Sequence, residues 1–201
     1  MKTKNLPALL LFLLLAAFAS GCTHVRPVAF TNPTLNAGAA PFPARVALVI
    51  KPEVSSFKHK YSMMGDTWEY PFGPSLEQYI RHVAGAAFAE VKEYPTTAAA
   101  ANQADAVVVV DSPKAEHTMP VLAWQKRGFV LRVNWTVNDR AGQSPVWLKT
   151  MESQAEENAG NAFTGSSHEK ILIQALMSQL STNTYQALVG AGELKGISRG
   201  P

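Results

Sequence analysis

"ADAVVVVDS", residues 104–112, is the stretch of the sequence that decides the fold. Its four consecutive valines, Val107 to Val110, leave no polar face. A short apolar run of this kind is typical of a strand that is covered on both sides of a sheet. We therefore expect a central strand here, with further strands on both of its edges.

Strands are also expected on either side of this one. In "GFVLRVNWTVN" (128–138) apolar and polar residues alternate, which predicts a half-buried strand. After a turn at "DRAGQ" (139–143), the segment "SPVWLKTMESQAE" (144–156) returns as its antiparallel partner. Nearer the N-terminus, "RVALVIKPE" (45–53) contains another short apolar run, which indicates a buried strand that opens the folded part.

Two amphipathic helices are predicted from apolar residues at helical spacing. The first begins at Ser75, which with Gln78 fits a capping box, and it ends before Pro95. The second begins at Ser166, which with Glu169 fits another capping box, and it ends at Gly190. The apolar stripes are Leu76, Ile80, Val83, Ala87 and Val91 in the first helix, and Leu172, Leu176, Leu180 and Leu188 in the second.

A hairpin is expected between the first strand and the first helix. "SFKHKYS" (56–62) and "TWEYPF" (67–72) both alternate, and Gly65 with Asp66 suits the turn between them. The second strand places Trp68, Tyr70 and Phe72 on one face. Two interpretations remain open: these aromatic residues form core beneath the helices, or they form a contact surface for a partner, since aromatic residues are enriched at interface cores.

A second candidate contact surface lies in "HTMPVLAWQKRG" (117–128). Trp124 and Arg127 combine an aromatic ring with positive charge, which suits a partner protein or anionic lipid headgroups. The alternative is a partly buried tryptophan in a long connection between strands.

The order of elements predicts an α+β fold, a mixed and mostly antiparallel sheet with two helices packed on one face. We expect a single domain at residues 45–190 and a mobile tail at 191–201. Residues 22–44 contain four prolines and no sustained periodicity, which predicts a flexible, extended tether. The alternative is that part of this segment packs on the domain through Phe30, Leu35 and Phe42.

The N-terminus has the features of a secretory signal peptide. Lys2 and Lys4 precede an almost wholly apolar run at residues 6–19, which is shorter than the ~20 residues that a membrane-spanning helix needs. Small residues then lead into Cys22 at Ala19-Ser20-Gly21-Cys22, and this stretch resembles the lipobox of bacterial lipoproteins. The resemblance implies cleavage of residues 1–21, a lipid on Cys22 and acylation of the new amino group. The alternative is that Cys22 is a free, buried cysteine.

By the same resemblance, Thr23 favours the outer membrane, since Asp at that position would retain an enterobacterial lipoprotein in the inner membrane. The domain would then face the periplasm, held by acyl chains in the membrane. Loss of residues 1–21 removes Lys2 and Lys4 and no acidic residue, so the formal charge falls from +3 to +1. With no clustered basic residues, we expect no nucleic-acid partner. Cys22 is the only cysteine, so no disulfide stabilises the domain.

Residues 45–190 also resemble a group of small periplasmic lipoproteins. The features that carry this resemblance are "RVALVIKPE", "FGPSLEQYIRHVAGAAFAEV" and "ADAVVVVDS". The group is related to the amino-terminal domain of the translocation protein TolB, and includes YajG-like and transport-auxiliary lipoproteins and one that serves exopolysaccharide export. The resemblance implies a non-catalytic component of the cell envelope and supplies no functional residues.

No motif in the sequence indicates catalysis or a cofactor. The histidines lack the converging spacing of a metal site, although His59 and His117 on neighbouring strands remain a geometrically possible pair. Ser75 and Ser166 do not match the G-x-S-x-G elbow, and no glycine-rich phosphate loop is present. We expect neither an enzyme nor a metal site. The first hypothesis is a lipid-anchored accessory or scaffold subunit with an envelope protein partner. The alternative is a periplasmic lipoprotein that binds a lipid or small molecule in a pocket between helices and sheet.

Overall fold

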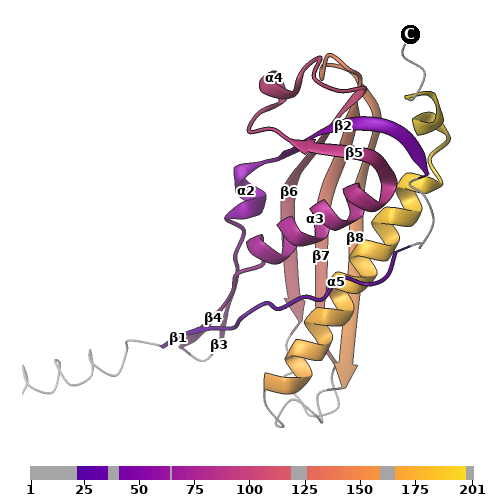
Figure 1. Ribbon diagram of the computed structural model, residues 1–201. Helices are drawn as coiled ribbons and strands as arrows, with labels where there is room; N and C mark the ends of the chain where they lie inside the picture. The colour runs from indigo at the N-terminus through magenta and orange to yellow at the C-terminus, as the bar shows by residue number, and fades with distance from the viewer. Residues whose placement is uncertain (1–21, 36–40, 64, 119–125, 159–165, 198–201) are drawn as a thin grey trace, which may run out of the picture.

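The computed structural model describes residues 22–35, 41–63, 65–118, 126–158 and 166–197. They form two sheets and a layer of helices (Figure 1). The large sheet has the order β5 (Phe88–Glu93), β2 (Phe42–Ile50), β6 (Ala106–Thr118), β7 (Lys126–Asn138) and β8 (Pro145–Asn158). The small sheet has the order β1 (Thr23–Val25), β4 (Asp66–Tyr70) and β3 (His59–Met63). The helices are α2 (Pro52–Ser55), α3 (Gly73–Ala87), α4 (Thr97–Ala100), α5 (Ser166–Val189) and the 3-10 helix η2 (Gly192–Gly196).

The predicted α+β class is confirmed, and so is the central place of the valine strand. β6 pairs with β2 in parallel and with β7 in antiparallel orientation. The longest pairings, β6 with β7 and β7 with β8, are both antiparallel. The predicted hairpin also forms as β3 and β4, but it belongs to the separate small sheet, where β1 adds to β4 in parallel.

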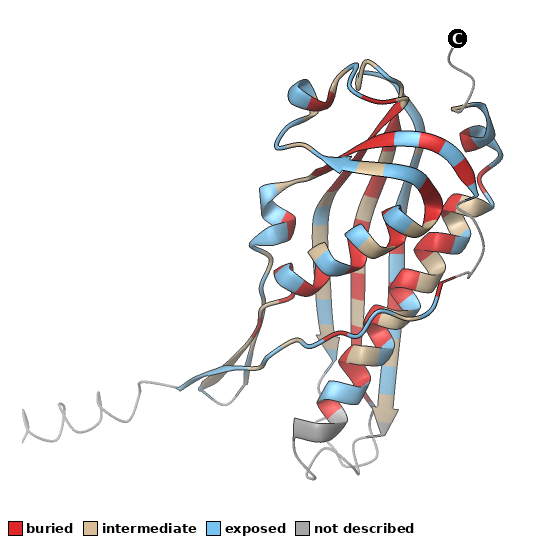
Figure 2. Ribbon diagram, in the orientation of Figure 1, coloured by how far each residue is buried: buried red, intermediate tan, exposed pale blue. Residues whose placement is uncertain are grey.

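The helices α3 and α5 lie on one face of the large sheet, as predicted, and enclose the main core (Figures 1 and 2). Alternation along β7 turns five fully buried side chains toward them: Phe129, Leu131, Val133, Trp135 and Val137. On the opposite face, Ala47, Val49, Val107 and Val109 pack with Ala100 of α4 in a second, smaller cluster. The valines of β6 are thus buried on both faces, which explains why the run has no polar residue.

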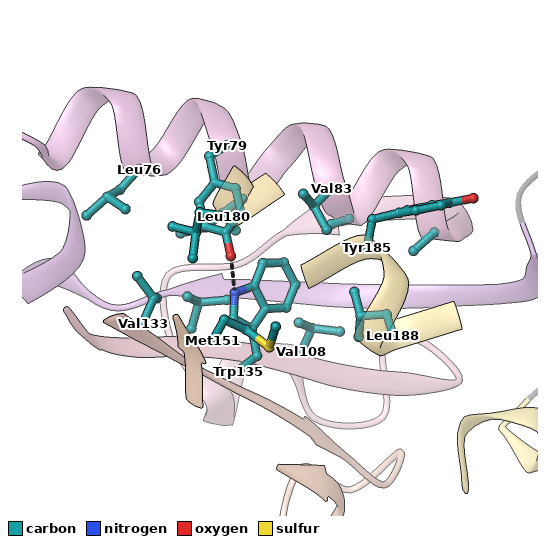
Figure 3. Close-up of a cluster of buried hydrophobic side chains, with 14 of the residues drawn as sticks. Leu76, Tyr79, Val83, Val108, Val133, Trp135, Met151, Leu180, Tyr185 and Leu188 are labelled. Atoms are coloured by element: carbon teal, nitrogen blue, oxygen red, sulfur yellow. Dashed lines mark hydrogen bonds between the residues drawn. The ribbon is translucent and has the colours of Figure 1, made fainter. Parts of the chain in front are cut away.

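A series of buried hydrogen bonds crosses the centre of the main core, and Figure 3 shows the first of them, between Trp135 and Tyr79. The Trp135 indole N–H donates to the Tyr79 hydroxyl at 2.9 Å. The Tyr79 and Thr184 oxygens lie 2.7 Å apart, and the Thr184 hydroxyl donates to the Leu180 carbonyl at 2.7 Å. Because Thr184 donates its single hydroxyl proton to Leu180, Tyr79 must be the donor to Thr184. The Trp135 N–H and the Tyr79 and Thr184 hydroxyls therefore all have hydrogen-bond partners. Burial raises the pKa of Tyr79 above its usual range.

The first predicted helix extends too far, because its last predicted residues form a strand. α3 ends at Ala87, and Phe88 is already extended, with φ −117° and ψ 148°. Residues 88–93 form β5, an edge strand parallel to β2, in which the Phe88 ring meets the Phe42 ring at 5.5 Å between centroids. Val91, predicted on the helix stripe, lies half-buried in this strand. The pairing with β2 outweighs the helical spacing of this short segment, as tertiary context often does.

The first predicted capping box does not form. α3 begins at Gly73 after Phe72, and no side chain caps it. Ser75 is buried, and its hydroxyl donates to the Val28 carbonyl at 3.0 Å. In the second box, the side chain of Ser166 lies outside the described residues, and Glu169 is buried.

The folded domain extends beyond residue 190, where it was predicted to end. At the C-terminal end, Ala191 and Leu194 are buried, and η2 packs on the core, so residues 191–197 are not a mobile tail. Residues 198–201 and the predicted signal peptide at 1–21 lie outside the described part. Within the described ranges, no helix is both long enough and apolar enough to cross a membrane.

Candidate functional site

Cys22 lies at the outer edge of the small sheet and is exposed. Its backbone N–H donates to Asp66 Oδ1 at 3.2 Å, and its carbonyl accepts from the Thr67 N–H at 3.0 Å. β1 continues this pairing along β4, with Thr23 opposite Thr67 and Val25 opposite Glu69. The residue predicted to carry lipid is therefore held by backbone hydrogen bonds, and the interpretation of Cys22 as a buried thiol is wrong.

Residues 26–35, the N-terminal strap, follow β1 and run across α5 (Figure 1). Thr31 and Gln174 exchange two hydrogen bonds of 2.8 Å, one from the Thr31 N–H and one to the Thr31 carbonyl. The carbonyls of Val28, Phe30 and Pro33 also bond to side chains of α3, namely Ser75, Gln78 and His82.

The strap corrects the prediction of a flexible tether at residues 22–44. Phe30 and Leu35 are buried in the main core, and Phe42 is buried at the start of β2. Prolines and small residues prevent a helix or a regular strand here, but side chains of both long helices supply hydrogen bonds to its backbone. The alternative interpretation, that this segment packs on the domain through these three apolar residues, is confirmed.

An aromatic and histidine cluster joins the small sheet to the end of β6 and β7. The His117 ring stacks on Phe129, with 4.0 Å between ring centroids and 7° between ring planes, and meets Tyr61 at 4.9 Å. The rings of His59 and His117 are 6.2 Å apart, so the pair judged possible from sequence is indeed adjacent. Tyr70 lies 5.7 Å from His117 in the same cluster.

The histidine pair is neutral at physiological pH. Burial, with smaller contributions from the nearby His59 and Arg127, lowers the pKa of His117 to about 3. Burial also lowers the pKa of His59. Among the residues that the structure describes, neither ring nitrogen of His117 has a hydrogen-bond partner, nor does Nε2 of His59. The stacking of His117 on Phe129 gives this ring a packing role in the core.

Of the predicted contact residues, Tyr70 and Phe72 are buried in the core and cannot contact a partner. For these two, the alternative of core packing is correct. Arg127 is also buried, and its guanidinium pairs with Glu157 at 2.8 Å across β7 and β8, so it is not an exposed charge. Trp68 is half-buried, and its ring stacks with that of the exposed His24, with 5.7 Å between the ring centroids. Trp124 lies outside the described residues.

Glu169 is the most unusual buried charge in the described part of the chain. It is 7% exposed, and its Oε1 has no hydrogen-bond partner within the described ranges. Burial, and then a hydrogen bond from the Tyr70 hydroxyl to this carboxylate, raise the pKa of Tyr70 above its usual range. Glu169 lines a small pocket of about 190 Å³ together with Arg26, Pro27, Lys170 and Ile173.

Within the described ranges, no three His, Cys, Asp or Glu side chains lie close enough to hold a metal ion. The sequence contained no signal for the strap's hydrogen bonds, because single serines, glutamines and histidines on a helix have many possible partners. Phe30 and Leu35 were the only indication that the segment packs.

No protein family model matches the chain, and no curated protein matches it. Several solved structures do. A Xanthomonas campestris protein of the DUF330 family is 12% identical, and the match covers 84% of this chain and 95% of that protein with a TM-score of 0.48. Uncharacterized lipoprotein B of Nitrosomonas europaea is 12% identical over 81% of this chain and 95% of its own, with a TM-score of 0.45. A PelC dodecamer from Paraburkholderia phytofirmans is 21% identical over 74% and 96%, with a TM-score of 0.32. These values assign neither a family nor a function.

Proposed function

We propose that this chain is a lipid-anchored bacterial lipoprotein that acts as a non-catalytic accessory or scaffold subunit of a cell-envelope assembly or transport system. The observation that carries the proposal is the N-terminus: a basic segment, an apolar run and small residues that lead directly into Cys22. The exposure of Cys22 at the edge of the folded structure supports it, because a lipid there would meet no buried atoms. By the identity of Thr23, the anchor is in the outer membrane and the domain faces the periplasm.

The packed interior supports a scaffold rather than a ligand carrier. The space between the helices and the large sheet is filled by fully buried side chains, including Tyr79, Trp135 and Leu180 (Figure 3). A ligand-binding lipoprotein of this class would need a cavity there, since binding pockets enclose most of a ligand's surface. The small pocket beside Glu169 favours the alternative, a lipid- or small-molecule-binding role.

The first experiment tests the anchor. The producing bacterium is grown with labelled palmitate, and the protein is analysed by intact mass and by separation of the two membranes. We expect label and the mass of a lipidated Cys22 in the outer-membrane fraction, and neither in a Cys22→Ser variant. Thr23→Asp is the matched variant for sorting, and it should keep the lipid but move to the inner membrane. An unlabelled wild-type protein with an intact residue 1–21 segment would refute the proposal.

The second experiment tests the scaffold role by cross-linking in living cells, followed by mass spectrometry of the captured proteins. We expect one dominant envelope protein with the wild type and its loss with Cys22→Ser. Capture of nothing specific by a correctly localised protein would contradict the scaffold role. Native mass spectrometry of the purified domain would then search for a molecule bound beside Glu169.

A further inference from the structure

We propose that β1 and the N-terminal strap fix the domain rigidly at the membrane surface, with the small sheet facing the lipid headgroups. This inference rests on the proposed lipidation of Cys22. It differs from the flexible-tether expectation in a measurable way. A free segment at residues 22–44 would reach about 75 Å, whereas the bonded segment holds the domain at one height and in one orientation.

The first step of the argument is the position of Cys22 itself. β1 starts at the very next residue, and both backbone groups of Cys22 already bond to β4 through Asp66 and Thr67. An N-acylated Cys22 keeps one amide N–H, so the bond to Asp66 Oδ1 survives the modification. The acyl chains would therefore begin at the edge of the small sheet, with no free residue between lipid and sheet.

The second step is that residues 26–35, which follow β1, are also held against the domain. The Arg26 N–H donates to the Glu69 carbonyl at 2.8 Å, which extends the β1 pairing into the strap. Gln174 of α5 then binds Thr31 on both sides, and the buried Phe30 and Leu35 lie on either side of Thr31. Backbone pairing, side-chain hydrogen bonds and apolar burial thus act in series between residues 22 and 35.

The third step is the chemistry of the small sheet. Tyr61 and Trp68 lie on the face of the small sheet that packs against the domain, with the Tyr61 ring 4.9 Å from the His117 ring. The opposite face is therefore the one that can meet the membrane. Lys58 and Lys60 lie on the other face with side chains 54% and 63% exposed, although both also contact Glu69. Ammonium groups this close to the anchor would meet the phosphates of anionic lipids. We therefore assign the headgroup layer of the bilayer as the occupant of this surface.

The test uses the purified, lipidated full-length protein in vesicles of phosphatidylethanolamine and phosphatidylglycerol. A photoreactive amino acid replaces Ser62, an exposed residue of β3, or Leu148, which is 67% exposed near the start of β8. Figure 1 shows that this end of β8 lies far from the small sheet. We expect at least fivefold more lipid cross-linking from position 62 than from position 148.

Slack at the anchor is then added as a control. Ten Gly and Ser residues inserted between Cys22 and Thr23 should bring the ratio close to one without changing lipidation. The same insertion in the turn at residues 139–143 adds equal length away from the anchor and should leave the ratio unchanged.

Each contrary outcome has its own meaning. Equal cross-linking from both positions with lipid present on Cys22 would overturn the rigid arrangement and leave the proposed lipoprotein function intact. Cross-linking of position 62 to a second copy of the chain would assign the small sheet to self-association and also overturn the inference. A Cys22 peptide without lipid in its mass spectrum would refute the proposed function, and the inference with it.

Discussion

At the scale of single residues, the Tyr79 hydroxyl is the most consequential polar atom in the core. It accepts from Trp135 and donates to Thr184, and all three side chains are fully buried. We expect Tyr79→Phe to lower the free energy of unfolding by about 1–3 kcal/mol, because it leaves the buried Trp135 N–H without an acceptor. Urea denaturation followed by circular dichroism measures the change.

Tyr185→Phe is the matched control for this variant. Tyr185 lies at the edge of the same cluster, and its oxygen points away from the cluster in Figure 3. The same atom is removed, but no buried donor loses its partner, so we expect a change of less than about 0.5 kcal/mol. Equal losses in both variants would show that the hydrogen-bond chain contributes nothing specific.

His117 gives the folded state a defined response to acid. Its pKa is about 3 in the folded protein and near 6.5 in an unfolded chain. Between these values the unfolded state binds more protons than the folded state, so stability is complete above about pH 6.5 and falls as the pH is lowered toward 3. The loss from this one group is at most about 1.4 kcal/mol for each pH unit, and His59 adds to it in the same direction.

Denaturation curves at pH 7.5, 6 and 5 measure this slope. His117→Phe keeps a ring stacked on Phe129 and removes the titration, so its stability should vary less with pH than that of the wild type. A His117→Phe variant as acid-sensitive as the wild type would contradict the assignment.

At the scale of elements, α3 carries two glycines with opposite roles. A Cβ on Gly73 would lie 2.0 Å from the Ser55 carbonyl oxygen, because α2 and α3 meet there. Gly85 has nothing within 4 Å of its Cβ position. We expect Gly73→Ala to cost about 1–3 kcal/mol through the forced shift of backbone. We expect Gly85→Ala to stabilise by about 0.5–1 kcal/mol, because alanine loses less backbone entropy in a helix.

Thermal unfolding of the two variants in parallel provides the measurement, since the chemical change is identical and only the surroundings differ. The melting temperature should fall for Gly73→Ala and rise for Gly85→Ala. Equal shifts would mean that the junction of α2 and α3 rearranges freely, and that the close approach at Gly73 is not required by the fold.

The elements that were predictable from sequence are those whose pattern is set by burial against their own neighbours. The alternation in β7 and the valines of β6 report directly which faces are covered, so both strands and their places were correct. β5 was missed because a six-residue strand at an edge needs only one partner, and Phe88 and Val91 fit the preceding helical stripe equally well. Ser75 was misassigned because its hydroxyl serves residue 28, which no local pattern indicates.

At the scale of the whole molecule, segments from both ends of the described chain pack against the main core. The strap adds Phe30 and Leu35 to the core from the N-terminal side, and η2 adds Leu194 from the C-terminal side. The N-terminal segment was predicted to be flexible because prolines and small residues are typical of linkers, and the C-terminal segment because it lies at the end of the domain. In this fold, apolar contacts and side-chain hydrogen bonds hold both segments against the domain. These contacts join residues far apart in the sequence, so the position of Cys22 beside the small sheet could not be predicted from local patterns.

This closure predicts that the N-terminal segment is part of the folding unit. We compare the chain that begins at Cys22 with one that begins at Pro41, which lacks β1 and the strap but retains β2. The shorter chain should lose about 3–6 kcal/mol of unfolding free energy, an upper estimate from the burial of Phe30 and Leu35. A double variant, Phe30→Ala with Leu35→Ala, should reproduce most of the loss in the full chain. A tether without structural role would leave the urea midpoint of all three proteins unchanged, and the rigid placement of the domain on its anchor would then have no basis.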